Sequence, residues 1–130
     1  MSKTPAVAIA VLIVIIGFVF FLKIGIIPKK VYGPYDNFIL CLKTNDAKMY
    51  GDYTSRYSLM QMSLFKDSLG IFEKSGIYIE CNKHGPNPKL DKCRKEGIKN
   101  YPTWIIKEKQ HIGVQGLNRL SELTGCKYEG

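Results

Sequence analysis

A pair of serines, Ser55 and Ser58, stands where the sequence predicts the start of a helix. Gly51-Asp52 breaks the preceding short strand, and either Thr54 or Ser55 is suited to cap the helix that follows. Backbone N–H groups and the helix dipole at such a position would lower the pKa of a thiol and make it a nucleophile near neutral pH. A serine hydroxyl stays protonated there unless a base accepts its proton, and it cannot form a disulfide. The spacing therefore suits a redox pair, but the residue types do not.

A base for Ser55 is hard to find in the sequence. His84 is predicted to lie in a loop and His111 in a strand, and neither is near the serines along the chain. We therefore favour a helix-capping role for Ser55 over a Ser–His hydrolase.

The elements that would position these residues follow from periodicity and from turn signals. They predict the order α-β-α-β-α-β-β-α with no internal repeat. The predicted helices are 35–45, 55–69 and 90–96 and a closing helix from Leu117 that ends at Gly125; the predicted strands are 47–50, 77–81, 103–106 and 110–114. In the second helix we expect Leu59, Met62, Phe65 and Leu69 to face inward and Gln61 and Lys66 outward. Met60 and Met62 are interpreted as packing residues and not as copper ligands.

Several short blocks in this order resemble one family over nearly the whole region from Val31 onward. The blocks are Cys41-Leu42, Ala47-Lys48-Met49-Tyr50-Gly51, Glu80-Cys81, Cys93 with Glu96-Gly97-Ile98, Tyr101-Pro102-Thr103-Trp104-Ile105-Ile106, Gly113-Val114-Gln115-Gly116-Leu117 and Leu123-Thr124-Gly125-Cys126. They resemble the thioredoxin-like domain that accompanies bacterial and archaeal vitamin K epoxide reductase homologues, within the disulfide oxidoreductases.

The resemblance implies an α/β thioredoxin-like fold, a central mixed sheet flanked by helices. It also implies a cis peptide bond before Pro102, followed by Thr103, facing the turn that carries Ser55 and Ser58. In that family this turn holds Cys-x-x-Cys, and here both sulfurs are replaced by oxygen. A shallow groove would remain beside the turn, where an extended segment could bind. Its expected aromatic binding face is Tyr53, Tyr57, Tyr101 and Trp104; the alternative is that Trp104 and one or two tyrosines are core residues.

Two functions remain open. The first is a redox-inactive binding or scaffold subunit of a membrane complex, with integral membrane proteins as partners. The second is a thiol–disulfide oxidoreductase in which both active-site cysteines, at positions 55 and 58, have been replaced by serine. Neither interpretation requires a cofactor.

The four cysteines all lie in the small folded region, where crosslinks would help stability. We expect two disulfides, and favour Cys81–Cys93 and Cys41–Cys126, although the other pairings stay open. The first would close a short ring, and the second would join the first and last helices. Two alternatives are a redox-active Cys81–Cys93 pair and zinc held by Cys81, His84 and Cys93, which lacks a clear fourth ligand.

The N-terminal part is expected to be a membrane anchor over residues 1–30. An apolar stretch from Ala6 to Ile27, interrupted by Lys23, has the roughly 20 residues that cross a bilayer. The stretch is longer than the apolar region of a typical signal peptide and lacks a small-residue cleavage site, so we expect a retained single-pass span. The soluble domain would then be 31–130.

The orientation signals conflict. Lys29 and Lys30 after the span favour a cytoplasmic domain, whereas the cysteines favour an oxidising, extracytoplasmic compartment. We follow the cysteines because the difference in positive charge is small. The net charge of +8 includes the anchor lysines, and no basic run is interleaved with aromatic residues, so we expect contact with lipid headgroups and no nucleic-acid binding.

Overall fold

A computed structural model of the chain describes residues 4–23 and 33–128. The chain divides into two compact units, Met1–Val31 and Tyr32–Gly130. Each unit is described by itself.

In the described part of the first unit the chain forms the helix α1 over Thr4–Lys23. The run of apolar residues explains the helix, since nothing between Ala6 and Leu22 interrupts it. Among the residues described, no helix combines the length and apolar character needed to cross a membrane. The predicted span ended at Ile27, and its last part lies outside the described residues.

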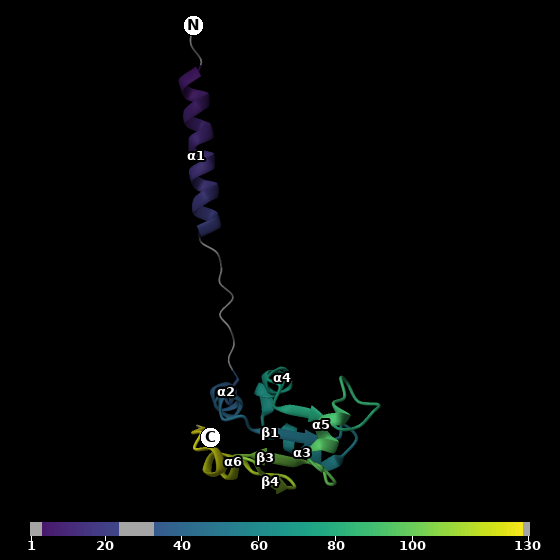
Figure 1. Ribbon diagram of the computed structural model, residues 1–130. Coiled ribbons are helices and arrows are strands. Elements are labelled where there is room, and N and C mark those ends of the chain that lie inside the picture. Colours follow the sequence, from purple (N-terminus) through teal and green to yellow (C-terminus); the bar gives the residue numbers. More distant parts are fainter. Residues whose placement is uncertain (1–3, 24–32, 129–130) are drawn as a thin grey trace. The chain divides into compact units, whose positions relative to one another are not determined.

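The second unit is built on a four-stranded mixed sheet with the order β2-β1-β3-β4 (Figure 1). Its strands are β1 (Lys48–Gly51), β2 (Tyr78–Glu80), β3 (Thr103–Ile106) and β4 (Lys109–Ile112). β1 runs parallel to β2 and antiparallel to β3, and β3 pairs antiparallel with β4. Both β2 and β4 are therefore edge strands.

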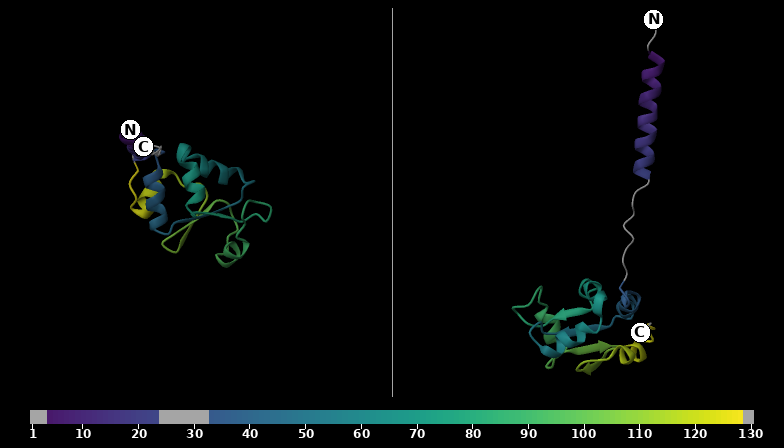
Figure 2. Two further views of the ribbon diagram at one scale, coloured as in Figure 1. Left: turned by 90° about the horizontal axis from the view of Figure 1, so that it is seen from above. Right: turned by 180° about the vertical axis from the view of Figure 1, so that it is seen from behind.

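Helices flank this sheet, as expected for a thioredoxin-like fold. They are α2 (Asp36–Thr44), α3 (Arg56–Ser63), α4 (Leu69–Lys74), α5 (Leu90–Lys95) and α6 (Leu117–Thr124), with a short 3-10 helix η1 (Lys66–Ser68) before α4. The first and last helices of this second unit, α2 and α6, lie side by side (Figures 1 and 2). The order of elements confirms the sequence prediction apart from one break in the second helix.

That break replaces the predicted helix 55–69 by α3, η1 and α4. Lys66 has a positive φ of 47°, which ends the helical path without a glycine or proline to signal it. The break allows Phe65 and Phe72 to stack with ring centroids 4.3 Å apart inside the core.

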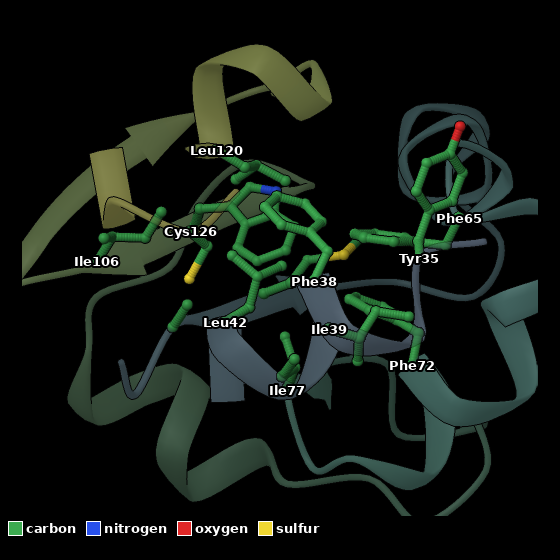
Figure 3. Close-up of a cluster of buried hydrophobic side chains, with 13 residues drawn as sticks. Tyr35, Phe38, Ile39, Leu42, Phe65, Phe72, Ile77, Ile106, Leu120 and Cys126 are labelled. Carbon is green, nitrogen blue, oxygen red and sulfur yellow. The ribbon is translucent and has the colours of Figure 1, made fainter. Parts of the chain in front are cut away.

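The main hydrophobic core lies on one face of the sheet (Figure 3). It combines side chains from α2, the α3–α4 segment, α6 and the strands, including Phe38, Leu42, Phe72, Ile106 and Leu120. A smaller cluster of Tyr50, Ile79 and Cys93 lies separately, with Cys81, Ile98 and Ile105 packed against it. Because residues alternate along a strand, the neighbours Met49 and Tyr50 belong to different clusters, and the sheet is covered on both faces.

Both favoured disulfides are present. Cys41 in α2 is bonded to Cys126 after α6, and Cys81 after β2 is bonded to Cys93 in α5. The chain has no other cysteines, so no cysteine is free.

Candidate functional site

The turn between β1 and α3 is held by its own polar groups. The backbone N–H of Ser55 donates to the carbonyl oxygen of Asp52 at 2.9 Å. The Asp52 carboxylate accepts from the backbone N–H of Thr54 at 2.8 Å and from the Thr54 hydroxyl at 2.7 Å. It also accepts from the amide of Asn82, so the turn is tied to the segment that follows β2.

These hydrogen bonds determine the charge of Asp52. Burial raises the pKa of its carboxyl, but hydrogen bonds from Thr54, Asn82 and the Ser55 backbone outweigh that effect and leave the pKa below its ordinary value. Asp52 is therefore an anion at neutral pH, and it lies in the same turn as Ser55.

The two serines act as hydrogen-bond acceptors within this turn. Ser55 caps α3, and its hydroxyl oxygen accepts from the backbone N–H of Ser58 at 3.4 Å. Ser58 is fully buried, and its hydroxyl oxygen accepts from the backbone N–H of Asp52 at 3.2 Å. A Cβ on Gly51 would lie 3.0 Å from the Ser58 hydroxyl and 2.7 Å from the Tyr78 ring, so this close approach requires glycine. Within the described residues neither serine is hydrogen-bonded to a histidine or a carboxylate that could remove its proton.

A buried carboxylate lies beside the turn. Glu80 at the end of β2 is 2% exposed and accepts from the Tyr78 hydroxyl at 2.7 Å, from the Asn82 N–H at 2.7 Å and from the Tyr53 N–H at 3.4 Å. Burial raises the pKa of Tyr78, and the hydrogen bond to Glu80 and its charge raise it further. Tyr78 is therefore a neutral hydrogen-bond donor to the buried side chain of Glu80. Glu80 belongs to one of the sequence blocks that carry the family resemblance, but its contacts with Tyr53, Tyr78 and Asn82 could not be predicted from the sequence.

The Pro102 loop lies close to the same carboxylates. The peptide bond between Tyr101 and Pro102 is cis. Burial raises the pKa of Tyr101, and the charges of Asp52 and Glu80 raise it further. Thr103 is buried, and its hydroxyl donates to the carbonyl oxygen of Asn100 at 2.7 Å. These residues therefore support the loop from inside.

An apolar groove of about 460 Å³ runs between the start of α3, the Pro102 loop and the end of β4. Its walls include Tyr57, Met60, Tyr101, Ile112 and Val114. Tyr57 is 60% exposed and Ile112 is 61% exposed. Exposed large apolar side chains around one hollow are typical of a binding surface. We call this hollow the α3–β4 groove.

The structure separates the four aromatic residues of the predicted binding face. Tyr57 and Tyr101 line the α3–β4 groove, whereas Tyr53 lines a different hollow beside Glu80. The placement of Trp104 on the binding face was wrong, because its side chain is 0% exposed and belongs to the main core. Its position in β3 pairs it with Met49, and both side chains face the helices.

Gln61 was also predicted wrongly. It is fully buried although we expected it to face solvent, whereas Leu59, expected inside, is exposed. The Gln61 side-chain oxygen accepts from the Trp104 indole N–H at 3.0 Å and from the Gln115 backbone N–H at 2.6 Å, and its amide donates to the Gln115 carbonyl oxygen at 2.9 Å. These bonds satisfy its polar atoms, so burial carries little penalty. Gln61 thus joins α3 to Trp104 in β3 and to Gln115 in the segment that follows β4.

The two alternatives for the cysteines, a zinc site and a redox-active Cys81–Cys93 pair, differ in what the structure says of them. Residues 4–23 and 33–128 hold no group of three or more His, Cys, Asp or Glu side chains placed to bind a metal. All four cysteines are in disulfides, and Cys81–Cys93 is therefore in the state that an oxidised redox pair would have, so its redox activity stays an alternative. What remains at the site is a turn, a buried carboxylate and an apolar groove.

Comparison with known proteins shows a similarity to a plant oxidoreductase. No protein-family model matches the chain. The chain is 33% identical over 87 residues to the thiol-disulfide oxidoreductase LTO1 of Arabidopsis thaliana. The similar region is 65% of this chain but only 22% of the plant protein.

Proposed function

We propose that the chain is a membrane-anchored, extracytoplasmic protein with a thioredoxin-like fold that lacks a redox dithiol. It binds an extended segment of a protein partner in the α3–β4 groove and serves as a subunit of a membrane complex. The observation that carries the proposal is the combination of this exposed apolar groove with a neighbouring turn that holds oxygen, not sulfur, at positions 55 and 58.

The groove suits a peptide better than a small polar molecule. Its walls are mostly aromatic and aliphatic, and it lies at the edge of the sheet next to β4. Aromatic residues and methionine are enriched in the energetically important parts of protein interfaces.

The anchoring part of the proposal rests on α1 and on the disulfides. The described part of α1 has no acidic residue, and its only basic residue is Lys23 at the end. Two disulfides in a domain of this size are typical of an oxidising compartment, which supports an extracytoplasmic position.

The experiment is purification of the full chain in mild detergent from its own membrane, comparing Ile112→Glu with Leu40→Glu. Leu40 on α2 is 49% exposed and does not line the groove, so its variant controls for a new surface charge. We expect integral membrane partners to copurify with the unchanged chain and with Leu40→Glu, and to be lost with Ile112→Glu. Equal retention by both variants would refute the groove as the binding site.

A thiol–disulfide oxidoreductase with both active-site cysteines replaced is the second candidate. The similarity to the plant oxidoreductase and the position of Ser55 at the start of α3 favour it. The two functions differ in one assay, reduction of insulin by the full chain carrying Ser55→Cys and Ser58→Cys. Activity that appears only in this double variant would favour the oxidoreductase; no activity in correctly folded material would favour the binding protein.

A further inference from the structure

A second hollow follows the outer edge of β2. It has a volume of about 710 Å³ and lies between α3, the end of α4, β2 and the loop that leads to α5. Leu59 and Met62 supply apolar side chains to its wall, and Lys74, Lys89 and Lys92 line it as well. It shares no residue with the α3–β4 groove.

The backbone of β2 presents unpaired groups along this hollow. Met49 donates to the Ile77 carbonyl at 2.9 Å and Cys81 donates to the Gly51 carbonyl at 2.8 Å, so alternate residues of this segment bond to β1. The intervening residues direct their backbone groups to the outer edge of the parallel pair. The register therefore turns the N–H and C=O of Tyr78 and the N–H of Glu80 away from β1, and among the described residues no backbone bond outside the strand ladder engages them.

One end of this edge is already closed. The Glu80 carbonyl accepts from the Lys89 N–H at 2.8 Å, and the loop passes so close that a Cβ on Gly85 would lie 2.5 Å from the Glu80 side chain. The free length of β2 is therefore short, and it extends from Glu80 back through Tyr78 toward Gly76.

The charges around the hollow favour an anionic occupant. Its three lysines are exposed, and none of them takes part in an ion pair among the described residues. Its two carboxylates are Glu73 and Glu80, and Glu80 is buried and accepts three hydrogen bonds. Glu73 is exposed, so an incoming chain would meet three exposed lysines and one exposed carboxylate, an excess of positive charge.

We propose that the outer edge of β2 is a second protein-binding site, which takes an extended acidic segment as an added strand. The backbone of that segment bonds to Tyr78 and Glu80, an apolar side chain enters between Leu59 and Met62, and its carboxylates lie against the lysines. The recognition combines main-chain hydrogen bonds with side-chain complementarity, as in other cases of strand addition. It is independent of the function proposed for the α3–β4 groove.

The test uses the full chain in uncharged detergent micelles and a fluorescein-labelled peptide of alternating glutamate and valine. We expect saturable binding that weakens with added salt, and no saturable binding of a matched peptide of alternating lysine and valine. Reversal of the charge at two of the lysines that line the hollow, in the double variant Lys74→Glu/Lys89→Glu, should weaken peptide binding about tenfold. The control Lys43→Glu/Lys99→Glu changes the net charge equally at exposed lysines outside the hollow and should bind normally.

A backbone measurement separates strand addition from attraction by charge alone. Bound peptide should slow hydrogen exchange at the amide protons of Tyr78 and Glu80, as measured by nuclear magnetic resonance. Ile112→Glu in the α3–β4 groove should leave this protection unchanged.

Three results would overturn the proposal. The first is peptide binding without protection of these amides, and the second is equal weakening in both lysine double variants. The third is binding of anionic lipid vesicles that depends on Lys74 and Lys89 while the peptide does not bind, which would assign the hollow to lipid headgroups.

Discussion

Replacement of Gln61 by alanine should destabilise the folded unit more than any surface change. The side chain makes three hydrogen bonds, to the Trp104 indole and to the backbone N–H and C=O of Gln115. A buried polar group that loses its partner costs about 1–3 kcal/mol. Trp104 is fully buried, so water cannot replace the lost acceptor, whereas Gln115 is only partly buried. We therefore expect the free energy of unfolding to fall by about 2–4 kcal/mol.

The assay is urea unfolding of the full chain with its disulfides intact. Trp104 is the only tryptophan in the sequence, so its fluorescence reports directly on the region that is changed. A matched control is Gln115→Ala, because the bonds to Gln61 use the Gln115 backbone and survive. The Gln115 side chain donates only to the carbonyls of Ile112 and Gly113, both at 3.2 Å, and its loss should cost less than about 1 kcal/mol. Similar unfolding midpoints for Gln61→Ala, the control and the unchanged chain would refute this reasoning.

Two further predictions concern crosslinks and pH. Serine at both Cys41 and Cys126, which are 85 residues apart, should lower the free energy of unfolding by about 4–5 kcal/mol, against about 3 kcal/mol for Cys81 and Cys93, which are 12 apart. Asp52 has a lowered pKa in the folded state, so its contribution to stability is complete above the unfolded pKa of about 3.9 and is lost as pH falls through the folded value. Asp52→Asn should therefore reduce the acid sensitivity of unfolding below about pH 4.

Each of these predictions has a clear contrary outcome. Equal thermal stability of the two cysteine double variants would show that loop length does not govern the effect of the crosslinks. An unchanged slope of stability against pH in Asp52→Asn would show that other carboxyl groups control unfolding in acid.

The order of the elements was predictable because it depends on local signals. Alternation identified the strand at Tyr78, and the leucines of α6 together with Gly125, whose φ is 79°, identified the closing helix and its end. The break after α3 was not predictable. Lys66 adopts a left-handed backbone conformation, and neither lysine itself nor a neighbouring glycine or asparagine indicates this conformation in the sequence.

The turn that carries Ser55 could be predicted from the sequence, but the side chains that surround the site could not. Ser55 could be identified as a cap from its residue type and its place in the sequence. The burial of Gln61 depends on Trp104 and Gln115, which are 43 and 54 residues away. A polar residue that is buried through such distant partners has the same local pattern as a solvent-facing one. The exposed Ile112 was missed for the related reason that periodicity assigns apolar residues to the interior.

The bond between Cys41 and Cys126 also affects how the domain would respond to proteolysis. It encloses most of the folded unit in one covalent ring. A protease that cuts a single peptide bond within this ring leaves the two pieces attached to each other. The fragments of the nicked molecule would stay joined until a reductant breaks the disulfide, and a cleaved surface loop need not release any part of the domain.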